Sequence, residues 1–360
     1  MADLQDFVVS RTDLRRTAFV PAQHGPATAL DTGDILVRVT RFALTANNIT
    51  YGAVGEMIGY WTFFPAPEGW GRIPVWGFAD VVRSQHGSIA VGERLYGYFP
   101  MSQYLVLRPE RVAAGGFVDA SPHRAALPAV YNQYTRVARE GSDAAREGEL
   151  ALFRPLFATS FLLDDFLDES GLFGAGAVVL SSASSKTALG LAFLLTQAKR
   201  CPVIGLTSPG NRDFVTRTGY YTSVLTYDEV VRLSTDTPTV FIDFAGNGAL
   251  VKAVHSRLGD ALRQSIQVGM THWERMAPAS ELPGPTPVFF FAPDRVKKRM
   301  GDWGAAEFQR RVGEALHRFL ASASTWLRIV ERSGPAALEA AYHAMLEGRM
   351  DPAEGNVLSL

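Results

Sequence analysis

The chain has 360 residues, of which 47% are apolar and 20% charged, and its formal net charge is −1. This composition is typical of a globular protein with a sizeable core. The balanced charge gives no basic surface for nucleic acid, and a single cysteine, Cys201, excludes a disulfide framework or a zinc site of several thiolates. The N-terminus has no apolar signal core, and no apolar run is long enough to span a membrane. We therefore expect a cytoplasmic protein without a membrane partner.

The first third of the chain is rich in short alternating runs bounded by Gly, Pro and Asp. Residues 33–45, 77–84, 92–99 and 103–109 are predicted strands. Their close spacing favours a compact β barrel or sandwich. The intervening stretch 51–77 is too rich in Gly, Pro and Trp for a regular element, so we expect a long structured loop.

The middle of the chain alternates strands with helices. Predicted strands near 178–182, 201–208, 223–227, 239–246 and 265–270 enclose helical runs. This alternation predicts an α/β fold with a doubly wound parallel sheet and right-handed crossovers. Two later helices, 304–324 and 334–348, precede a closing strand, 355–360, that we expect to rejoin the β-rich part. The expected domains are 1–155 with 326–360, and 156–325, with a cleft between them.

The segment "SSASSKTALG", residues 181–190, joins a predicted strand to a helix. It lacks the glycines of a P-loop, which argues against an NTPase, and it also lacks Gly-x-Gly-x-x-Gly. A helix N-terminus can nevertheless bind phosphate through its N–H groups. Ser184, Ser185 and Thr187 would add hydroxyl groups, and Lys186 would add a positive charge. The alternative is an ordinary serine cap on a core helix.

The end of the next predicted strand indicates which dinucleotide would bind. A carboxylate there selects NAD, whereas a basic residue accommodates the 2′-phosphate of NADP. The sequence "VIGLTSPGNRDF" has Ser208 at the strand end and Arg212 leading into the helix, with no carboxylate between them. Arginine is a natural partner of phosphate. The alternative is a solvated arginine on a surface helix.

With these segments in place, the chain resembles the medium-chain dehydrogenase/reductase superfamily, most of all its zinc-free quinone-oxidoreductase branch, as a distant subfamily. The resemblance implies a GroES-like β domain, a Rossmann domain, an NADP(H) cofactor and frequent homodimers. The matching segments are "ALTANNITYG", "FATSFLL", "VIGLTSPGNRDF", "FIDFAGNGAL" and "IQVGM". Besides the residues above, the cofactor contacts that it implies are Asn47, Thr159, Tyr227, Gly246 and Gly269.

A zinc-free reductase needs a group that meets the developing charge on a substrate oxygen. The resemblance places Tyr51 near the nicotinamide, so Tyr51 is the candidate hydrogen-bond donor or proton source. The alternative is that Tyr51 only packs in the core. Aromatic residues of the long loop would form an apolar pocket for a quinone or an α,β-unsaturated carbonyl, or would instead fill a small core under that loop. The pocket candidates are Tyr60, Trp61, Phe63 and Trp76.

The expected function is therefore an NADPH-dependent, zinc-independent reductase of quinones or enones. Two alternatives stay open at this point. The fold could serve a non-redox, lyase-type reaction, or the chain could be a binding protein that lost its cofactor affinity together with the glycines.

Overall fold

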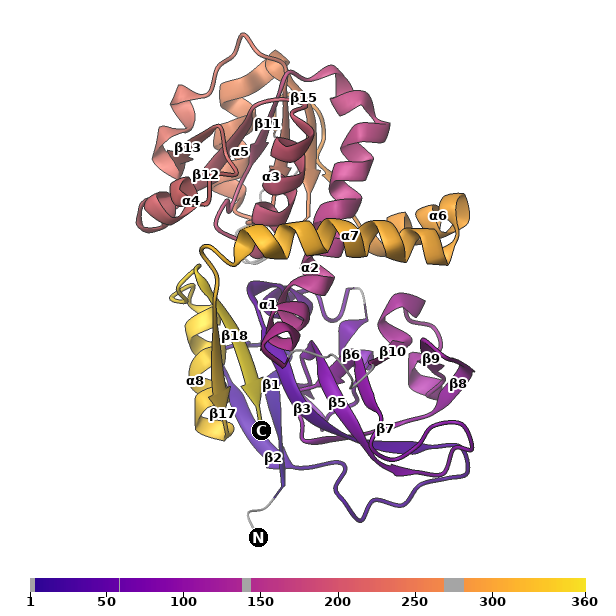
Figure 1. The fold of residues 1–360 in the computed structure, drawn as a ribbon. Helices are drawn as coiled ribbons and strands as arrows, with labels where there is room; N and C mark the ends of the chain where they lie inside the picture. The colour runs from indigo at the N-terminus through magenta and orange to yellow at the C-terminus, as the bar shows by residue number, and fades with distance from the viewer. Residues whose placement is uncertain (1–3, 58, 138–143, 269–281) are drawn as a thin grey trace. The chain divides into compact units, whose positions relative to one another are not determined.

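The computed structural model describes residues 4–57, 59–137, 144–268 and 282–360. It divides the chain into two compact units, which Figure 1 shows as ribbons. Unit 1 comprises Met1–Leu152 and Arg328–Leu360, and unit 2 comprises Phe153–Leu327. Among the residues described, no helix is both long and apolar enough to cross a membrane.

Unit 1 is built on two β-sheets. One has the strand order β2-β1-β4, and the other has the order β17-β18-β3-β5-β6-β10-β9-β8, with β7 also paired to β3. The strands of the first third are β1 (Gln5–Ser10), β2 (Thr17–Pro21), β3 (Ile35–Leu44), β4 (Trp70–Gly71), β5 (Pro74–Ser84), β6 (Arg94–Pro100), β7 (Tyr104–Leu107), β8 (Pro109–Ala113), β9 (Gly116–Asp119) and β10 (Gln133–Val137). The two C-terminal strands are β17 (Arg328–Ser333) and β18 (Glu354–Ser359).

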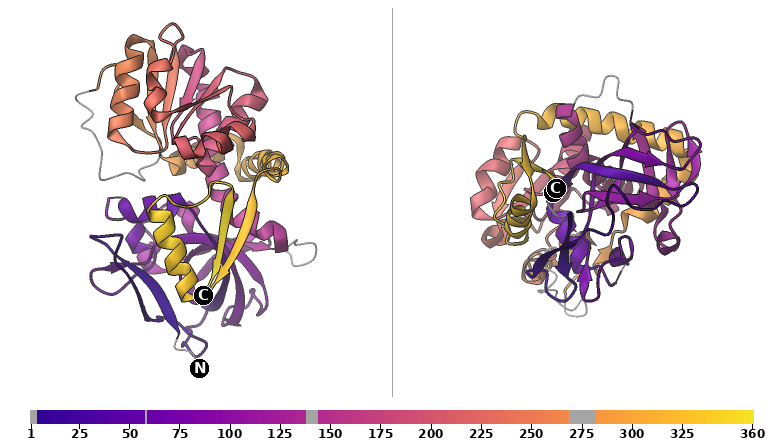
Figure 2. Two further views of the ribbon diagram at one scale, coloured as in Figure 1. Left: turned by 90° about the vertical axis from the view of Figure 1, so that its left-hand side faces the viewer. Right: turned by 90° about the horizontal axis from the view of Figure 1, so that it is seen from below.

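The end of the chain completes the larger sheet of unit 1. Strand β18 pairs antiparallel with β3, with Val357 opposite Ala43, and parallel with β17. Helix α8 (Pro335–Leu346) joins β17 to β18 and packs against both, as Figure 2 shows. The predicted return of the last strand to the β-rich part is thus observed. It requires a parallel pair joined by a helix, which is the usual crossover for parallel strands.

Unit 2 contains a six-stranded parallel sheet with the order β13-β12-β11-β14-β15-β16. Its strands are β11 (Ala177–Leu180), β12 (Val203–Thr207), β13 (Ser223–Thr226), β14 (Thr239–Asp243), β15 (Leu262–Gln267) and β16 (Val288–Phe289). Within the part of the chain that the structure describes, the remaining α-helices are α1 (Ala46–Ala53), α2 (Ala144–Glu169), α3 (Lys186–Ala198), α4 (Arg212–Thr218), α5 (Gly248–Leu258), α6 (Ala292–Trp303) and α7 (Ala305–Ala323). The 3₁₀ turns are η1 (Tyr60–Thr62), η2 (Pro122–Arg124), η3 (Ala129–Asn132), η4 (Gly171–Gly174), η5 (Pro209–Asn211), η6 (Tyr227–Arg232) and η7 (Gly259–Ala261).

The central strands β11 and β14 of the parallel sheet are buried along their whole length, as expected of strands that are covered on both faces. On one face Val179 and Phe241 pack with Val254 of α5. Helices α3 and α4 contact β12, and Phe193 of α3 packs edge to face against Phe319 of α7. Helices therefore cover the sheet on both sides, as Figures 1 and 2 show, which is the doubly wound arrangement predicted from the alternating pattern.

Candidate functional site

The turn after β11 is made without glycine. Ser182 has φ +48°, a left-handed conformation that glycine usually supplies. Ser185 caps α3, because its Oγ accepts the N–H of Ala188 at 3.3 Å. The predicted strand, turn and helix are all present, and the α3 N-terminus follows directly on the sheet edge.

A glycine in the neighbouring strand β12, Gly205, leaves room for the turn after β11 to lie close to the sheet. A Cβ added to Gly205 of β12 would lie 2.9 Å from the Cβ of Ala183, so this glycine lets the turn sit close to the sheet. The Tyr221 hydroxyl also donates to the Ala183 carbonyl at 2.8 Å. These contacts hold the turn close to strand β12. The sequence analysis identified neither Gly205 nor Tyr221 as part of it.

Asn211 connects the turn after β11 to the turn after β12. Its Nδ2 donates to Ser184 Oγ at 3.0 Å, and its N–H donates to the Ser208 carbonyl at 3.0 Å. Because Ser184 accepts this bond, its own hydroxyl proton can point to another oxygen. Asn211 was not among the predicted residues, although it directly precedes Arg212 in the sequence.

Arg212 lies at the start of α4, close to a carboxylate. Its Nη1 is 3.1 Å from Glu229 Oε2, and 41% of its side chain is exposed. Glu229 also accepts the N–H of Thr226 at 3.0 Å and pairs with Arg232 at 2.6 Å. These contacts lower the pKa of Glu229 to about 2, so it is charged at neutral pH. The sequence signal that could have identified Glu229 is the Thr-x-x-Glu pattern of a capping box at 226–229.

A buried serine and aspartate join β11 to β14. Ser181 Oγ donates to Asp243 Oδ1 at 2.6 Å and accepts the N–H of Phe244 at 2.8 Å. Asp243 also accepts the N–H groups of Ala245, at 3.1 Å, and Gly246, at 3.0 Å. The network fixes the backbone that follows β14. The sequence analysis identified Gly246 but missed Ser181 and Asp243.

Tyr227 lies at the same edge of the sheet, immediately after β13. Burial raises the pKa of Tyr227, and the nearby Asp243 carboxylate raises it further, whereas hydrogen bonding to Ser182 opposes the rise. Gly246 has φ +68°, which favours glycine there. The structure thus brings Ser182, Tyr227, Asp243 and Gly246 together where three parallel strands end, the usual ligand-binding edge of such sheets.

Other predicted residues of unit 2 occupy the helices beside this edge. Lys186 and Thr187 form the first turn of α3, and the Thr187 carbonyl accepts Ser160 Oγ of α2 at 2.7 Å. Thr159, on the same helix, directs its hydroxyl to the Pro155 carbonyl at 3.4 Å. Gly269 lies outside the described residues.

In unit 1, Tyr51 of α1 belongs to a cluster of aromatic rings. The ring centroids of Tyr51 and Tyr60 are 4.5 Å apart, and the hydroxyls of Tyr60 and Tyr131 form a 2.8 Å hydrogen bond. Tyr98 packs 4.9 Å from Trp76 and 4.9 Å from Tyr131. Burial raises the pKa of Tyr51, so its phenol stays protonated at neutral pH and can donate. Tyr98 and Tyr131 were not predicted as members of this group.

The remaining predicted residues of unit 1 have different surroundings. Phe63 is in the cluster, 5.3 Å from Tyr98. Trp61 is 3% exposed and packs between two glycines, since a Cβ on Gly55 or Gly71 would lie 2.3 Å from its indole. Asn47 is on α1, one helical turn before Tyr51, and its side chain lowers the pKa of that tyrosine in part. Within the described ranges, no group of three or more His, Cys, Asp or Glu side chains could hold a metal ion.

Several solved structures share the fold of this protein over nearly the whole chain. CurA from Vibrio vulnificus in complex with NADPH matches with a TM-score of 0.63, 14% identity and 98% coverage of each chain. A putative NADPH:quinone reductase from Mesorhizobium loti matches with a TM-score of 0.59 and 13% identity over 99% of this chain and 98% of that chain. The yhdH oxidoreductase from Salmonella enterica in complex with NADP matches with a TM-score of 0.56 and 14% identity over 99% of this chain and 100% of that chain. The predicted medium-chain dehydrogenase/reductase fold, a GroES-like domain with a Rossmann domain, is confirmed.

No protein with a curated description matches this sequence. A family model does match, over residues 42–351, and its description reads "Protein of unknown function (DUF2855)". This match spans most of the 360 residues, and the chain therefore belongs to the DUF2855 family.

Proposed function

We propose that this protein is an NADPH-dependent, zinc-independent oxidoreductase that reduces a quinone or an α,β-unsaturated carbonyl by hydride transfer. The observation that carries the proposal is the placement of Arg212 and Ser208 at the end of β12, beside the α3 N-terminus. Structures with this fold include complexes with NADPH and NADP, which supports the choice of cofactor.

The residues of the turn after β11 fit a pyrophosphate. Serine side chains replace the usual glycines, but Gly205 lets the backbone stay close to the sheet, and Ser184 has a proton to donate once it accepts from Asn211. The Thr187 N–H and the positive end of the α3 dipole would also attract the negatively charged pyrophosphate. Ser185 would contribute as the helix cap and Lys186 as a cation, so the hydroxyl groups and the charge compensate for the missing glycines.

The residues near η6 fit an adenosine ribose that carries a 2′-phosphate. Arg212 can donate two N–H groups to phosphate oxygens while 41% of its side chain is exposed. Ser208 can add a hydroxyl donor, and Tyr227 lies at the same edge. Gly246, with its fixed backbone, Thr159 and Gly269 complete the proposed contacts in unit 2, and Asn47 is the proposed contact from unit 1.

When bound, NADPH supplies the hydride. Reduction of an enone places negative charge on the carbonyl oxygen, which a donor must stabilise. Tyr51 is the proposed donor, because the resemblance places it near the nicotinamide and a tyrosine phenol, whose pKa burial here raises further, is protonated at neutral pH. Its neighbours Tyr60, Phe63 and Trp76 give the surrounding surface an apolar and aromatic character, which suits a quinone or an aromatic enone. Trp61 is proposed to support this surface through packing. We also propose a homodimer, as the resemblance implies.

Steady-state assay of purified protein tests the proposal. Substrate-dependent oxidation of NADPH with a panel of quinones and enones is expected, and NADH should be the poorer cofactor. A lyase-type reaction would proceed without net NADPH consumption. A binding protein that has lost its cofactor affinity would show no saturable NADPH binding.

A further inference from the structure

Ser184, in the turn after β11, is held by two residues from other parts of unit 2. Its Oγ accepts a hydrogen bond from Asn211 Nδ2 at 3.0 Å. The carbonyl of the preceding residue, Ala183, accepts one from the Tyr221 hydroxyl at 2.8 Å. Ser184 is half-buried, whereas Ala183 is fully buried. One bond therefore acts on the side chain of Ser184, and the other acts on the peptide group that carries its N–H.

Tyr221 fixes the orientation of the peptide group between Ala183 and Ser184. A trans peptide places its C=O and its N–H on opposite sides, so the Ser184 N–H points away from the Tyr221 hydroxyl. No residue that the structure describes accepts this N–H. The Ala183 N–H donates to the Leu206 carbonyl of β12 at 3.0 Å, which anchors the same residue to the sheet. A flip of the peptide would exchange the free N–H for a carbonyl oxygen, which repels an anion.

The Tyr221 side chain is itself fixed and protonated. A Cβ added to Gly205 of β12 would lie 2.9 Å from Cδ1 of Tyr221, so the ring packs directly on the backbone of that strand. Burial raises the pKa of Tyr221, and the neighbouring Tyr227 raises it further. The phenol therefore keeps its proton at neutral pH and donates it to the Ala183 carbonyl.

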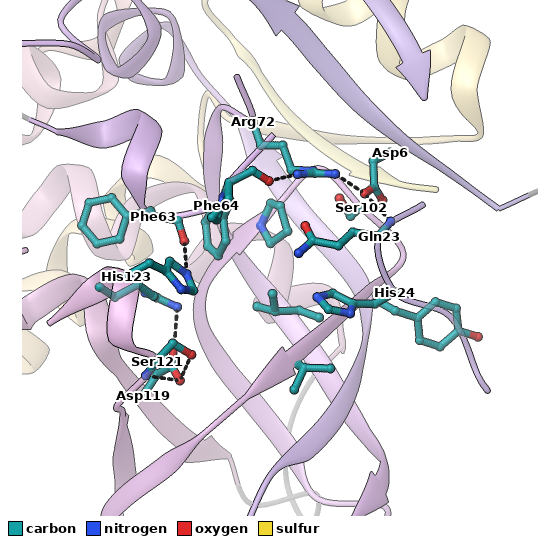
Figure 3. Close-up of a pocket in the computed structure, with 16 residues that line it drawn as sticks. Asp6, Gln23, His24, Phe63, Phe64, Arg72, Ser102, Asp119, Ser121 and His123 are labelled. Atoms are coloured by element: carbon teal, nitrogen blue, oxygen red, sulfur yellow. Dashed lines mark hydrogen bonds and ion pairs between the residues drawn. The ribbon is translucent and has the colours of Figure 1, made fainter. Parts of the chain in front are cut away.

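A serine at a pocket of unit 1 provides a contrast to Ser184. Figure 3 shows Ser121 beside Asp119, and Ser121 Oγ donates to Asp119 Oδ1 at 2.8 Å. That hydroxyl proton is used by a carboxylate of the protein. The Ser184 hydroxyl instead accepts its bond from Asn211, and no carboxylate that the structure describes takes its proton. The proton of Ser184 is therefore left for a ligand.

We propose that Tyr221 and Asn211 are positioning residues for the pyrophosphate of the dinucleotide, Tyr221 by directing the Ser184 N–H to it and Asn211 by directing the Ser184 hydroxyl proton to it. This inference rests on the proposed NADPH site. Ser184 precedes the N-terminus of α3, whose dipole favours the same negative charge. A turn without glycine thus obtains two oriented donors from side chains that lie far away in the sequence.

Titration of the full-length protein with three ligands tests the role of Tyr221. Tyr221→Phe should raise the Kd of NADPH and of NADH by the same factor, about fivefold, because both contain the pyrophosphate and a hydrogen bond to a charged group is weakened. The Kd of adenosine 2′-monophosphate, which has no pyrophosphate, should not change. Tyr220→Phe is the matched control. Its hydroxyl is bonded to Ser322 Oγ at 2.7 Å and to Trp326 Nε1 at 3.0 Å, away from the turn, so all three Kd values should stay as in wild type.

A double-mutant cycle with Ser184→Ala separates the two positioning residues. Asn211→Ala alone should raise the Kd of NADPH about fivefold, since the Ser184 hydroxyl loses its orientation. In the Ser184→Ala background, Asn211→Ala should have no further effect, because the hydroxyl that it orients is gone. Tyr221→Phe should keep its full effect in that background, because alanine retains the backbone N–H.

Several results would overturn the inference. For Tyr221→Phe they are an NADPH affinity equal to that of wild type, a loss for NADPH without a loss for NADH, or an equal loss for adenosine 2′-monophosphate. For Asn211→Ala the contradicting result is an effect that survives in the Ser184→Ala background. Circular dichroism of each variant establishes that it is folded. Absence of saturable NADPH binding to wild type would remove the proposed function as well, whereas normal binding to wild type with unaffected variants would remove only the positioning roles.

Discussion

Arg212 and Glu229 form an ion pair in which Nη1 and Oε2 are 3.1 Å apart. Glu229 is held in place by Thr226 and shares its charge with Arg232, 2.6 Å away. The arginine proposed to meet the 2′-phosphate of NADPH therefore has an anionic neighbour. Glu229 orients Arg212 and at the same time repels a phosphate, and in an exposed pair the orienting effect is small.

Glu229→Gln should consequently strengthen NADPH binding. Removing one negative charge near a doubly charged phosphate should lower the Kd for NADPH about fivefold in a solvated setting. NADH lacks this phosphate, so its affinity should change by less than about twofold. Nicotinamide fluorescence titrations with both cofactors measure the ratio. Glu314→Gln, which alters an exposed pair with Arg310 on α7, is the control. An equal gain for NADH and NADPH would show that Glu229 does not act on the 2′-phosphate.

The sequence analysis predicted much of the fold, because the spacing of the apolar residues and the positions of Gly, Pro and Asp agree with the observed strands and helices. The apolar strands of unit 2 and the amphipathic α7 are patterns that local residues determine. The full length of α2 was missed, since Pro155 lies inside it and proline normally argues for a helix end. Strand β17, "RIVERS", was missed because four of its six residues are charged or polar.

The candidate site was predicted in part. The sequence analysis proposed four of its residues from their places in recognisable segments, namely Ser184, Ser185, Arg212 and Tyr227. Gly205 and Asp243 could not be identified in this way, because their roles depend on contacts across strands that lie far apart in the sequence. Glu229 illustrates the same limit, since it reaches Arg212 only after η6 has folded back.

Asp243→Asn should destabilise unit 2. The buried carboxylate accepts from Ser181 Oγ and from the N–H groups of Ala245 and Gly246, and an amide would turn one acceptor into a donor facing them. The expected loss in the free energy of unfolding is about 2–4 kcal/mol. Urea denaturation followed by far-UV circular dichroism measures it. Asp236→Asn, at an exposed position, should change stability by less than about 0.5 kcal/mol. Similar values for the two variants would refute the role of the network.

Gly190→Ala should weaken the packing of α3 on α2. The new Cβ would lie 2.7 Å from Ser160 Oγ, which is fixed by bonds to Leu156 and Thr187 and cannot move aside cheaply. The clash should cost about 1–3 kcal/mol, more than the gain of up to about 1 kcal/mol from replacing a helical glycine. Gly313→Ala in α7, where nothing lies within 4 Å, should instead stabilise the protein. The Tm of each variant is measured by thermal melting. A shift of both Tm values in the same direction would contradict the prediction that the two substitutions have opposite effects on stability.

Tyr51→Phe should lower kcat in NADPH-dependent reduction of an enone or quinone by about 100-fold or more, because the proton or hydrogen bond to the substrate oxygen is lost. KM should change little, since the ring and its packing are kept. Tyr342→Phe removes another buried hydroxyl, which donates to the Leu14 carbonyl at 3.0 Å. That control should lose stability and keep its kcat. A Tyr51→Phe variant with wild-type kcat would remove Tyr51 from the mechanism.

The central claim, an NADPH site at the edge of the parallel sheet of unit 2, is tested most directly by fluorescence titration of wild type and Arg212→Ala with NADPH and NADH. The account predicts saturable binding of one NADPH per chain to wild type. Arg212→Ala should weaken NADPH binding by about tenfold or more and leave NADH binding unchanged, since only the phosphate contact is removed. Absence of saturable NADPH binding to the folded wild-type protein, or equal affinities of both proteins for NADPH, would contradict it.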